Sequence, residues 1–350
     1  MQIGNKHIGK GRTYVIAEFG VNHNGSLERA KEGIIKAAMA GADAIKFQTY
    51  TANELVVKGT PKFWDAESKV DEGLDQHQAY QALEGFKYEW YPELIDCCEK
   101  NGIEFLSTPF SFEAADYLNS IGMKAFKVAS SDMSTLPYLK HIARYQKPII
   151  LSTGASSLDE IKEAVRAIEE EGNEQIILLH CTLCYPTKDE DANYNLIRTL
   201  KKEFKFYPVG VSDHTMGSFT STIAVAMGAE VVEKHYTVDK TLGMSADHWL
   251  SVDPTELGEI VAGARRIEVL RGSSLKCVFN AESETRKYDK RSIVSKRNIK
   301  SGEQITEDML TYKRPGTGIW PKHLARVLKK TAKVNIPADT TLDWEMFNQQ

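Results

Sequence analysis

Long apolar runs and cysteine-rich stretches are both missing from this sequence, and their absence narrows the class of protein. The 350 residues contain no apolar stretch of about 20 residues, the length that a membrane-spanning helix needs. The opening segment MQIGNKHIGKGRTYVIAE has no apolar core like that of a signal peptide. The cysteines, which show neither zinc-ribbon spacing nor the density of a disulfide scaffold, are Cys97, Cys98, Cys181, Cys184 and Cys277. We therefore expect a cytoplasmic protein with no membrane partner.

The sequence also lacks a marked excess of one charge and two common nucleotide-binding signatures. Charged residues make up 26% of the chain and the formal net charge is -4, which gives no reason to expect a nucleic-acid partner. The segment GVNHNG at 20–25 lacks the glycine spacing of a dinucleotide-binding turn, and no P-loop is present. With 42% hydrophobic residues, the chain can bury one large core and a smaller second one.

Short apolar runs of strand character recur along the chain, each followed by a segment of helical period. The eight runs are TYVIAE (13–18), DAIKFQTY (43–50), IEFLSTPF (103–110), KAFKVASS (124–131), PIILSTG (148–154), QIILLHC (175–181), YPVGVSD (207–213) and EVVEKHY (230–236). Alternating strands and helices imply a parallel sheet. Eight such units predict a closed (β/α)8 TIM barrel over residues 1–272, because closure removes both edge strands. A doubly wound open sheet is the alternative.

Three segments depart from the repeating pattern. Residues 51–89 are long, polar and aromatic, which is typical of a lid or specificity loop on a barrel and equally of a solvated excursion with one helix. Residues 273–289 are polar without periodicity and are expected to form a linker. Residues 290–350 have short strand-like runs, turn glycines and one short helical stretch, which predicts a small β-rich domain.

Polar or ionisable residues stand at the ends of nearly all eight predicted strands: Glu18, Lys46, Gln48, Thr108, Lys127, Ser130, Ser152, His180, Thr182, Ser212, His214, Glu233 and His235. Barrel active sites are built at the C-terminal ends of the strands. Because side chains alternate along a strand, Lys46 shares a face with Gln48, and Glu233 shares one with His235. Buried polar groups need partners, so these residues should pair with one another or with a ligand.

The residue types suggest two kinds of chemistry. Two lysines entering one barrel mouth, with hydroxyls from other strands, favour an anionic substrate such as a phosphate. A buried lysine can instead form a Schiff base, as in an aldolase. His214 and His235 follow adjacent strands and could share a divalent metal with open coordination positions.

The chain resembles the sialic acid synthases, in the broad sense of nonulosonate synthases that join phosphoenolpyruvate to an N-acylated hexose. The motifs that carry the resemblance are AEFGVNHNG, AIKFQTY, FLSTPF, FKVASSD, ILSTGASS, LLHCTLCYPT, VGVSDHTMG, VVEKHYTVDKTLGMSADHWLSVDP and KRPGTGI, in this order through residues 17–319. The resemblance implies that residues 290–350 form an antifreeze-like (SAF) domain. It also implies condensation of phosphoenolpyruvate, the hexose and water, with release of phosphate by C–O cleavage.

The resemblance assigns roles to particular residues. The catalytic residues would be Glu18, which would manage a proton or activate water, and the metal ligands His214 and His235. The phosphoenolpyruvate site would comprise Lys46, Thr108, Lys127, Ser130, Ser152 and Ser212. The sugar site would comprise Gln48, Asp132, Tyr185, Asp247 and Arg314. The cation would be Mn2+, with Mg2+ or Co2+ as alternatives. Arg314 would enter the barrel mouth of a partner subunit, which implies a domain-swapped homodimer.

Two positions depart from the pattern of the family. Leu183 stands where some members have Asn or another polar residue, and Asp132 stands where the N-acetylneuraminate synthases have Glu. These departures leave the hexose open between N-acetylmannosamine and a 2,4-diacetamido-2,4,6-trideoxyhexose. Two other functions are weighed against the synthase: a Schiff-base pyruvate aldolase that uses Lys127, and a non-catalytic carbohydrate-binding protein.

Overall fold

The structure is a computed structural model that describes residues 1–64, 72–84, 87–243 and 247–348. The chain divides into two compact units, residues 1–272 and 273–350. No helix among the described residues is long and apolar enough to cross a bilayer.

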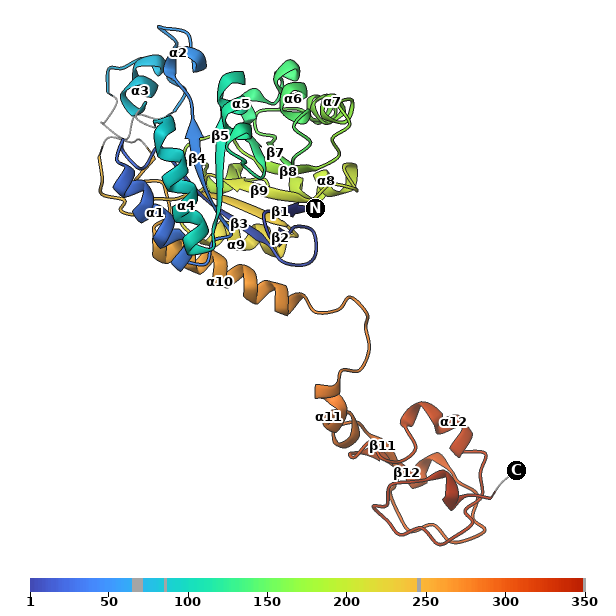
Figure 1. The fold of residues 1–350 in the computed structure, drawn as a ribbon. Coiled ribbons are helices and arrows are strands. Elements are labelled where there is room, and N and C mark those ends of the chain that lie inside the picture. Colours follow the sequence, from blue (N-terminus) through green and yellow to red (C-terminus); the bar gives the residue numbers. More distant parts are fainter. Residues whose placement is uncertain (65–71, 85–86, 244–246, 349–350) are drawn as a thin grey trace. The chain divides into compact units, whose positions relative to one another are not determined.

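Eight parallel strands form the sheet of the first unit, which confirms the predicted barrel (Figure 1). They are β3 (Tyr14–Gly20), β4 (Ala44–Thr49), β5 (Glu104–Pro109), β6 (Phe126–Val128), β7 (Ile149–Ser152), β8 (Ile176–Cys181), β9 (Val209–Asp213) and β10 (Val231–His235). Their order is β5-β4-β3-β10-β9-β8-β7-β6. The two end strands, β5 and β6, contact each other and bring the sheet round on itself.

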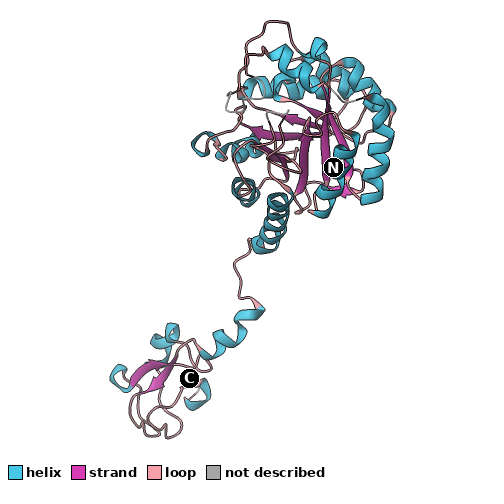
Figure 2. Ribbon diagram, turned by 90° about the vertical axis from the view of Figure 1, so that its left-hand side faces the viewer, coloured by secondary structure: helices cyan, strands magenta, loops and turns pink. Residues whose placement is uncertain are grey.

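The helices that cover the outside of this sheet are visible in Figure 2. They are α1 (Leu27–Met39), α4 (Tyr91–Asn101), α5 (Phe112–Ser120), α6 (Leu136–Ala143), α7 (Leu158–Glu169), α8 (Asn195–Glu203), α9 (Phe219–Ala226) and α10 (Pro254–Arg271). Ser26, Ser111, Ser157 and Asp253 each accept a hydrogen bond from a backbone N–H of the helix that they begin. These contacts satisfy donors that have no partner inside the helix.

The barrel strands bury both faces, in keeping with their almost continuous apolar sequences. The outward side chains pack against the helices in the main core. The inward side chains at the N-terminal ends of the strands form a separate apolar plug, which includes Tyr14, Ile16, Leu106, Ile150, Ile177, Leu179 and Val231. A hairpin of β1 (Gln2–Ile3) and β2 (Lys6–His7) adds Ile3 and Ile8 to the plug. The barrel interior is therefore dry at one end, and only the opposite end is open to a ligand.

Gly210 shows how crowded this interior is. A Cβ atom at Gly210 would lie 2.2 Å from the carbonyl oxygen of Val231 and 2.9 Å from a methyl carbon of Leu179. Strand β9 can therefore approach β10 closely only because residue 210 has no side chain.

The second unit has its own small core around Ile293, Ile299, Ile305, Leu310, Val327, Ile336 and Leu342. Its antiparallel pair is β11 (Ser292–Ser295) with β12 (Leu310–Lys313), accompanied by α12 (Leu324–Val327) and several isolated bridges. The segment expected to be an irregular linker contains the helix α11 (Ser283–Tyr288). Just before this helix, the Glu282 carboxylate accepts the N–H of Phe279, which helps to begin a turn that the sequence period did not reveal.

Asp43 anchors the closed end of the barrel. Its carboxylate is fully buried and accepts hydrogen bonds from Lys6 at 2.8 Å, Arg12 at 2.7 Å and Arg265 at 3.1 Å, and from the N–H of Val15 at 2.9 Å. Burial alone would raise the pKa of Asp43, but the hydrogen bonds and cations outweigh it and lower the pKa below the ordinary value. The carboxylate therefore ties the N-terminal segment and α10 to β3 and β4.

Asp43→Asn is expected to lower the free energy of unfolding by about 2–3 kcal/mol, because it leaves several donors around one buried site without their charged acceptor. Since the folded-state pKa of Asp43 is depressed, its contribution is present above the unfolded pKa of about 3.9 and is lost as pH falls through the lower folded value. Urea unfolding at pH 7 measures the loss. Asp96→Asn, which removes an exposed pair with Lys100, is the control and should cost only a few tenths of a kcal/mol. Equal losses in the two variants would contradict this role.

Candidate active site

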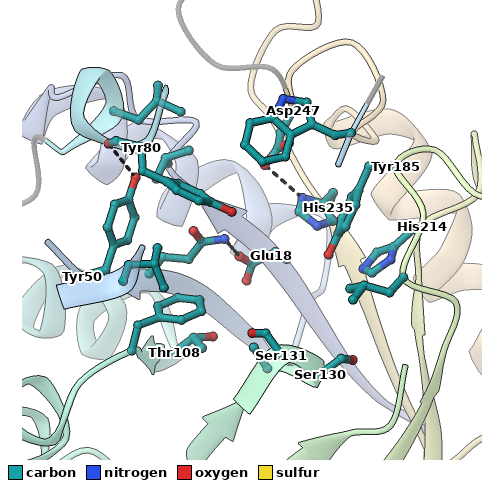
Figure 3. A pocket seen from close by; sticks show the side chains of 18 of the residues that line it. Glu18, Tyr50, Tyr80, Thr108, Ser130, Ser131, Tyr185, His214, His235 and Asp247 are labelled. Carbon is teal, nitrogen blue, oxygen red and sulfur yellow. Dashed lines mark hydrogen bonds and ion pairs between the residues drawn. The ribbon is translucent and has the colours of Figure 1, made fainter. Parts of the chain in front are cut away.

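A cavity of about 300 Å³ opens at the C-terminal ends of the barrel strands (Figure 3). Twelve of the residues to which the resemblance assigns roles line it: Glu18, Lys46, Gln48, Thr108, Lys127, Ser130, Ser152, Tyr185, Ser212, His214, His235 and Asp247. They come from strands β3 to β10 and from the loops that follow them. One cavity therefore gathers residues separated by more than two hundred positions, as a barrel site requires.

Two lysines and two carboxylates form the charged floor of this cavity. Their side chains are only 3% to 6% exposed. Lys46 forms an ion pair with Glu18, and its Nζ lies 3.8 Å from the Glu233 carboxylate. Lys127 Nζ lies 3.6 Å from the other oxygen of Glu233. Glu233 therefore stands between the two ammonium groups, and the four formal charges of the floor cancel.

The electrostatics of Glu18 differ from those of an ordinary carboxyl. Burial raises its pKa to about 6, and the nearby Glu233 acts in the same direction, against the lowering effects of Lys46 and Gln48. Gln48 donates a hydrogen bond from Nε2 to Glu18 Oε1 at 3.0 Å. A carboxyl with such a pKa can exchange a proton near neutral pH, which suits a general base.

Hydroxyl groups complete the floor, and some polar atoms remain without partners. Lys46 donates to Thr108 Oγ1 at 2.9 Å, and Ser212 donates to Glu233 Oε1 at 2.9 Å. Ser152 Oγ and Glu233 Oε2 are buried and have no hydrogen-bond partner among the described residues. Such atoms are costly unless a ligand or water satisfies them. Their position in the cavity wall indicates a polar ligand.

The two histidines lie side by side, because His214 follows β9 and His235 ends the adjacent strand β10. Their ring centroids are 5.4 Å apart, and Tyr185 stacks on His214 at 4.2 Å. His214 Nδ1 is 2.9 Å from the carbonyl oxygen of Thr182, which can only accept, so this nitrogen carries a proton, and in the neutral ring Nε2 is left as an acceptor. Against the effect of burial, Cys181 and the Thr182 carbonyl raise the pKa of His214. His235 is buried, which holds its pKa well below the ordinary value and keeps the ring neutral.

This pair fits a metal ion in part. A neutral imidazole whose other nitrogen donates to a carbonyl is the usual form of a histidine ligand. His235 Nδ1 is buried without a hydrogen bond, 3.6 Å from Asp247 Oδ2. Across the described ranges, no three His, Cys, Asp or Glu side chains converge tightly enough to hold a metal by themselves. Two imidazoles would therefore hold a cation only with water or substrate oxygens as further ligands, as in open catalytic sites.

Two buried polar networks fix the loops around the histidines. On the outer face of the sheet, Lys234 Nζ lies 3.0 Å from Asp213 Oδ2, and this pair is 1% and 0% exposed. Beyond β10, His248 contacts Asn24 Oδ1 at 3.0 Å and Thr237 Oγ1 at 2.8 Å. The first network holds the residue before His214, and the second holds the residue after Asp247. Both loops are thus positioned by packing rather than by the ligand.

The alternation along β8 corrects one expectation. His180 was expected among the polar strand ends at the barrel mouth, but it points outward, where its Nε2 contacts the Ala192 carbonyl oxygen at 2.7 Å. Ile177 and Leu179 face the barrel interior, so Cys181 is the next inward residue and lines the cavity. The period of two, counted from Leu179, could have identified Cys181.

Three other residues singled out from the sequence are not polar side chains at a strand end in the cavity wall. Asp132 does not line the main cavity; it faces a neighbouring hollow bordered by Glu54, Thr135 and Tyr138. Burial raises the pKa of Asp132 to about 6. Leu183 lines the main cavity and offers it no hydrogen bond from its side chain. Arg314 belongs to the second unit, where it pairs with Asp289 at 2.8 Å.

The segment expected as a lid supplies the wall beside Glu18. It contains α2 (Ala52–Leu55) and α3 (Gln76–Leu83), where the sequence suggested one helix. In Figure 3, Tyr50 lies to one side of Glu18 and Tyr80 above Tyr50 on that side, and the Tyr50 hydroxyl donates to the Tyr80 carbonyl oxygen at 3.3 Å. Residues 65–71 and 85–86 of the predicted insertion lie outside the described residues.

Comparison with known proteins matches both units. A model of the NeuB family matches residues 33–276, and a model of the SAF domain matches residues 290–348. The chain is 40% identical over 336 residues to the N,N'-diacetyllegionaminic acid synthase of Legionella pneumophila, covering 95% of this chain and 94% of that protein. It is 35% identical over 340 residues to the pseudaminic acid synthase of Campylobacter jejuni, covering 96% of each.

A solved structure agrees with these matches. The N-acetylneuraminic acid (sialic acid) synthetase of Leptospira borgpetersenii, in complex with citrate, superposes with a TM-score of 0.72 at 35% identity. The match covers 81% of this chain and 94% of that chain. The resemblance read from the sequence motifs is confirmed: the chain belongs to the NeuB family and carries a C-terminal SAF domain.

Proposed function

We propose that this protein condenses phosphoenolpyruvate, an N-acylated hexose and water to give a nonulosonic acid and phosphate. The relatives named above are synthases of such acids, which supports the reaction class. The observation that carries the proposal is the buried floor of Lys46, Lys127, Glu18 and Glu233 beside two adjacent histidines. The two sugars left open are N-acetylmannosamine and a 2,4-diacetamido-2,4,6-trideoxyhexose.

The floor has the chemistry to receive phosphoenolpyruvate. Lys46 and Lys127 can bind its carboxylate and phosphate, while Thr108, Ser130, Ser152 and Ser212 line the same cavity with hydroxyls. A phosphate monoester carries about -1.5 to -2 charges near pH 7, and the carboxylate adds another. Because the formal charges of the floor already cancel, this substrate requires further positive charge at the site. A divalent cation and Arg314 are the proposed sources.

His214 and His235 are the proposed ligands of that cation, with Mn2+ first and Mg2+ or Co2+ as alternatives. A divalent metal at this position would polarise the aldehyde oxygen of the open-chain sugar as a Lewis acid. Asp247, beside His235, is placed to accept a hydrogen bond from the sugar. Gln48 and Tyr185 also line the cavity and are proposed to contact the sugar, whereas Asp132 would reach it only through a local rearrangement.

The proposed order of bond changes follows from the chemistry of phosphoenolpyruvate. The C3 carbon of phosphoenolpyruvate attacks the sugar aldehyde, which forms the new C–C bond and leaves positive charge at C2. Water adds to C2 and gives up a proton, and Glu18 is the proposed base. Phosphate then leaves with its bridging oxygen, so the C–O bond breaks, the C2 hydroxyl becomes the ketone of the product, and its proton leaves with the phosphate. The proton that Glu18 took from water would neutralise the alkoxide left on the former aldehyde oxygen. The two lysines hold the anion through these steps, and the apolar plug below them keeps bulk water out of the barrel.

The second unit is proposed to complete the site of a partner subunit in a domain-swapped homodimer. Residues 273–350 carry 15 Lys and Arg against 9 Asp and Glu, although the whole chain is negative. A positive domain suits a cavity that takes an anionic substrate. Arg314, whose side chain is 64% exposed, is free to leave its surface pair with Asp289 at little cost.

The reaction is tested with purified full-length chain, Mn2+, phosphoenolpyruvate labelled with 18O at the bridging oxygen, and each of the two sugars in turn. We expect sugar-dependent phosphate release with the label in the phosphate, measured by mass spectrometry. Absence of release with both sugars, or label in the organic product, would contradict the proposal. Pyruvate with borohydride is the control for the aldolase, and it should leave the mass of the chain unchanged.

Loss of either histidine should abolish tight Mn2+ binding. His214→Ala and His235→Ala are each expected to weaken the binding of Mn2+ in the presence of phosphoenolpyruvate at least about 100-fold, measured by the electron paramagnetic resonance of free Mn2+. His7→Ala, on the exposed hairpin, is the matched control. If both cavity variants keep the affinity of the control while melting at its temperature, the metal site lies elsewhere.

The pKa of Glu18 predicts the acid limb of the rate profile. As a base, Glu18 must be ionised, so kcat/KM should fall about tenfold per pH unit below a pH of about 6. Glu18→Gln should remove this limb and lower kcat about 100-fold or more. Glu99→Gln on the exposed surface of α4 serves as the control. A limb that persists unchanged in Glu18→Gln would assign it to another group.

A further inference from the structure

The cavity has two chemically different halves. The floor carries the charges and most hydroxyls, whereas the wall beside Glu18 is mostly apolar and has as its polar members Gln76 and the hydroxyls of Tyr50 and Tyr80. An aromatic row runs along this wall, with ring centroids 6.1 Å apart for Phe110 and Tyr50, 5.6 Å for Tyr50 and Tyr80, 5.6 Å for Tyr80 and Trp64, and 5.0 Å for Trp64 and Phe63. Aliphatic side chains from α2 and α3 and the segment between them extend the row: Leu55, Val56, Leu74, Ala79, Ala82 and Leu83. These eleven side chains are called the roof below.

The roof lies away from the two histidines. In Figure 3, Tyr50 and Tyr80 are on one side of the cavity, and His214 and His235 are on the other. A sugar that holds its aldehyde carbon near the histidines therefore extends its far end toward the roof. Of the two tyrosine hydroxyls in the aromatic row, that of Tyr50 donates to the Tyr80 carbonyl oxygen at 3.3 Å.

The mostly apolar character of the roof discriminates between the two candidate sugars. N-acetylmannosamine has hydroxyls at C4 and C6, and both would lose water against apolar carbon without gaining equivalent partners. A 2,4-diacetamido-2,4,6-trideoxyhexose presents a methyl group and an acetyl methyl at the same end. An apolar pocket discriminates a single methyl group by about 10- to 200-fold, so the roof should favour the second sugar.

We infer that the roof selects the sugar by its far end and accepts a hexose with a 6-methyl group and a second N-acyl group in preference to N-acetylmannosamine. This rests on the proposed function, because it assumes that the aldehyde end sits beside the histidines. The inference makes α3 a specificity element. Leu183, which stands where some members of the family have a polar residue, lines the same cavity. Its apolar side chain is consistent with a less hydroxylated substrate.

Ala82 offers a direct test. Its side chain lines the cavity near the end of α3, and leucine there would extend into the roof while favouring the helix. Gln81→Leu, on the same helix but outside the cavity lining, is the matched control. Both variants and the parent chain are titrated with each sugar in the presence of Mn2+ and phosphoenolpyruvate, and kcat/KM is measured by phosphate release. Binding is followed separately by tryptophan fluorescence, because Trp64 and Trp249 line the cavity.

The parent chain should show at least about a tenfold higher kcat/KM and affinity for the trideoxy sugar. Ala82→Leu should lower both quantities about tenfold for that sugar and less than about twofold for N-acetylmannosamine, whereas Gln81→Leu should match the parent. Preference for N-acetylmannosamine, or an equal loss for both sugars in Ala82→Leu, would overturn the inference. Fluorescence binding of the trideoxy sugar without phosphate release would refute the proposed reaction and leave the selectivity of the roof supported.

Discussion

The sharing of Glu233 between two buried lysines is the interaction on which the rest of the site depends. Its carboxylate lies 3.6 Å from the Lys127 Nζ and 3.8 Å from the Lys46 Nζ, inside a barrel whose other end is filled by apolar side chains. Two charges about 4 Å apart interact by about 4 kcal/mol at an effective dielectric constant of 20, so the shared carboxylate offsets part of the cost of burying the two side chains. The two lysines thus pair with two internal carboxylates in a cluster without net formal charge. An anionic substrate would compete with these carboxylates for the lysines.

The barrel makes this cluster possible because the contacts that stabilise the fold and the charged floor lie at opposite ends. Asp43 and the apolar plug close one end, where Ile3 and Ile8 of the N-terminal hairpin complete the packing. At the other end, the polar side chains of the floor form ion pairs and hydrogen bonds with one another. Parallel strands in register place Glu18 beside Lys46 and Glu233 beside Ser212, so the geometry of the floor follows from backbone pairing. Loops then add what the strands cannot supply, namely His214, Tyr185 and Asp247.

Most of this floor can be predicted from the amino-acid sequence, because period-two alternation and strand ends are local signals. Alternation alone assigns Lys46 and Gln48 to one face of their strand, and it does the same for Glu233 and His235. His180 points outward because it is the neighbour of Leu179, whose side chain faces the barrel interior. The position of Asp132 depends on how the turn after β6 folds, and the roof depends on which side of α3 meets the barrel. Such tertiary contacts leave no periodic trace in the sequence.

The formal charges of the floor cancel, so the cation and Arg314 are proposed to supply the positive charge that an anionic substrate needs. A neutral floor binds a multiply charged substrate only if positive charge arrives with it or the internal carboxylates move aside. Calorimetric titration of phosphoenolpyruvate in the presence of Mn2+ tests this most directly. Lys127→Met should weaken binding at least about tenfold, a difference of about 1.4 kcal/mol, whereas Glu233→Gln should tighten it, because the first variant removes an attraction and the second removes a repulsion. Equal affinities in the parent chain and both variants, each folded by its melting temperature, would contradict the account.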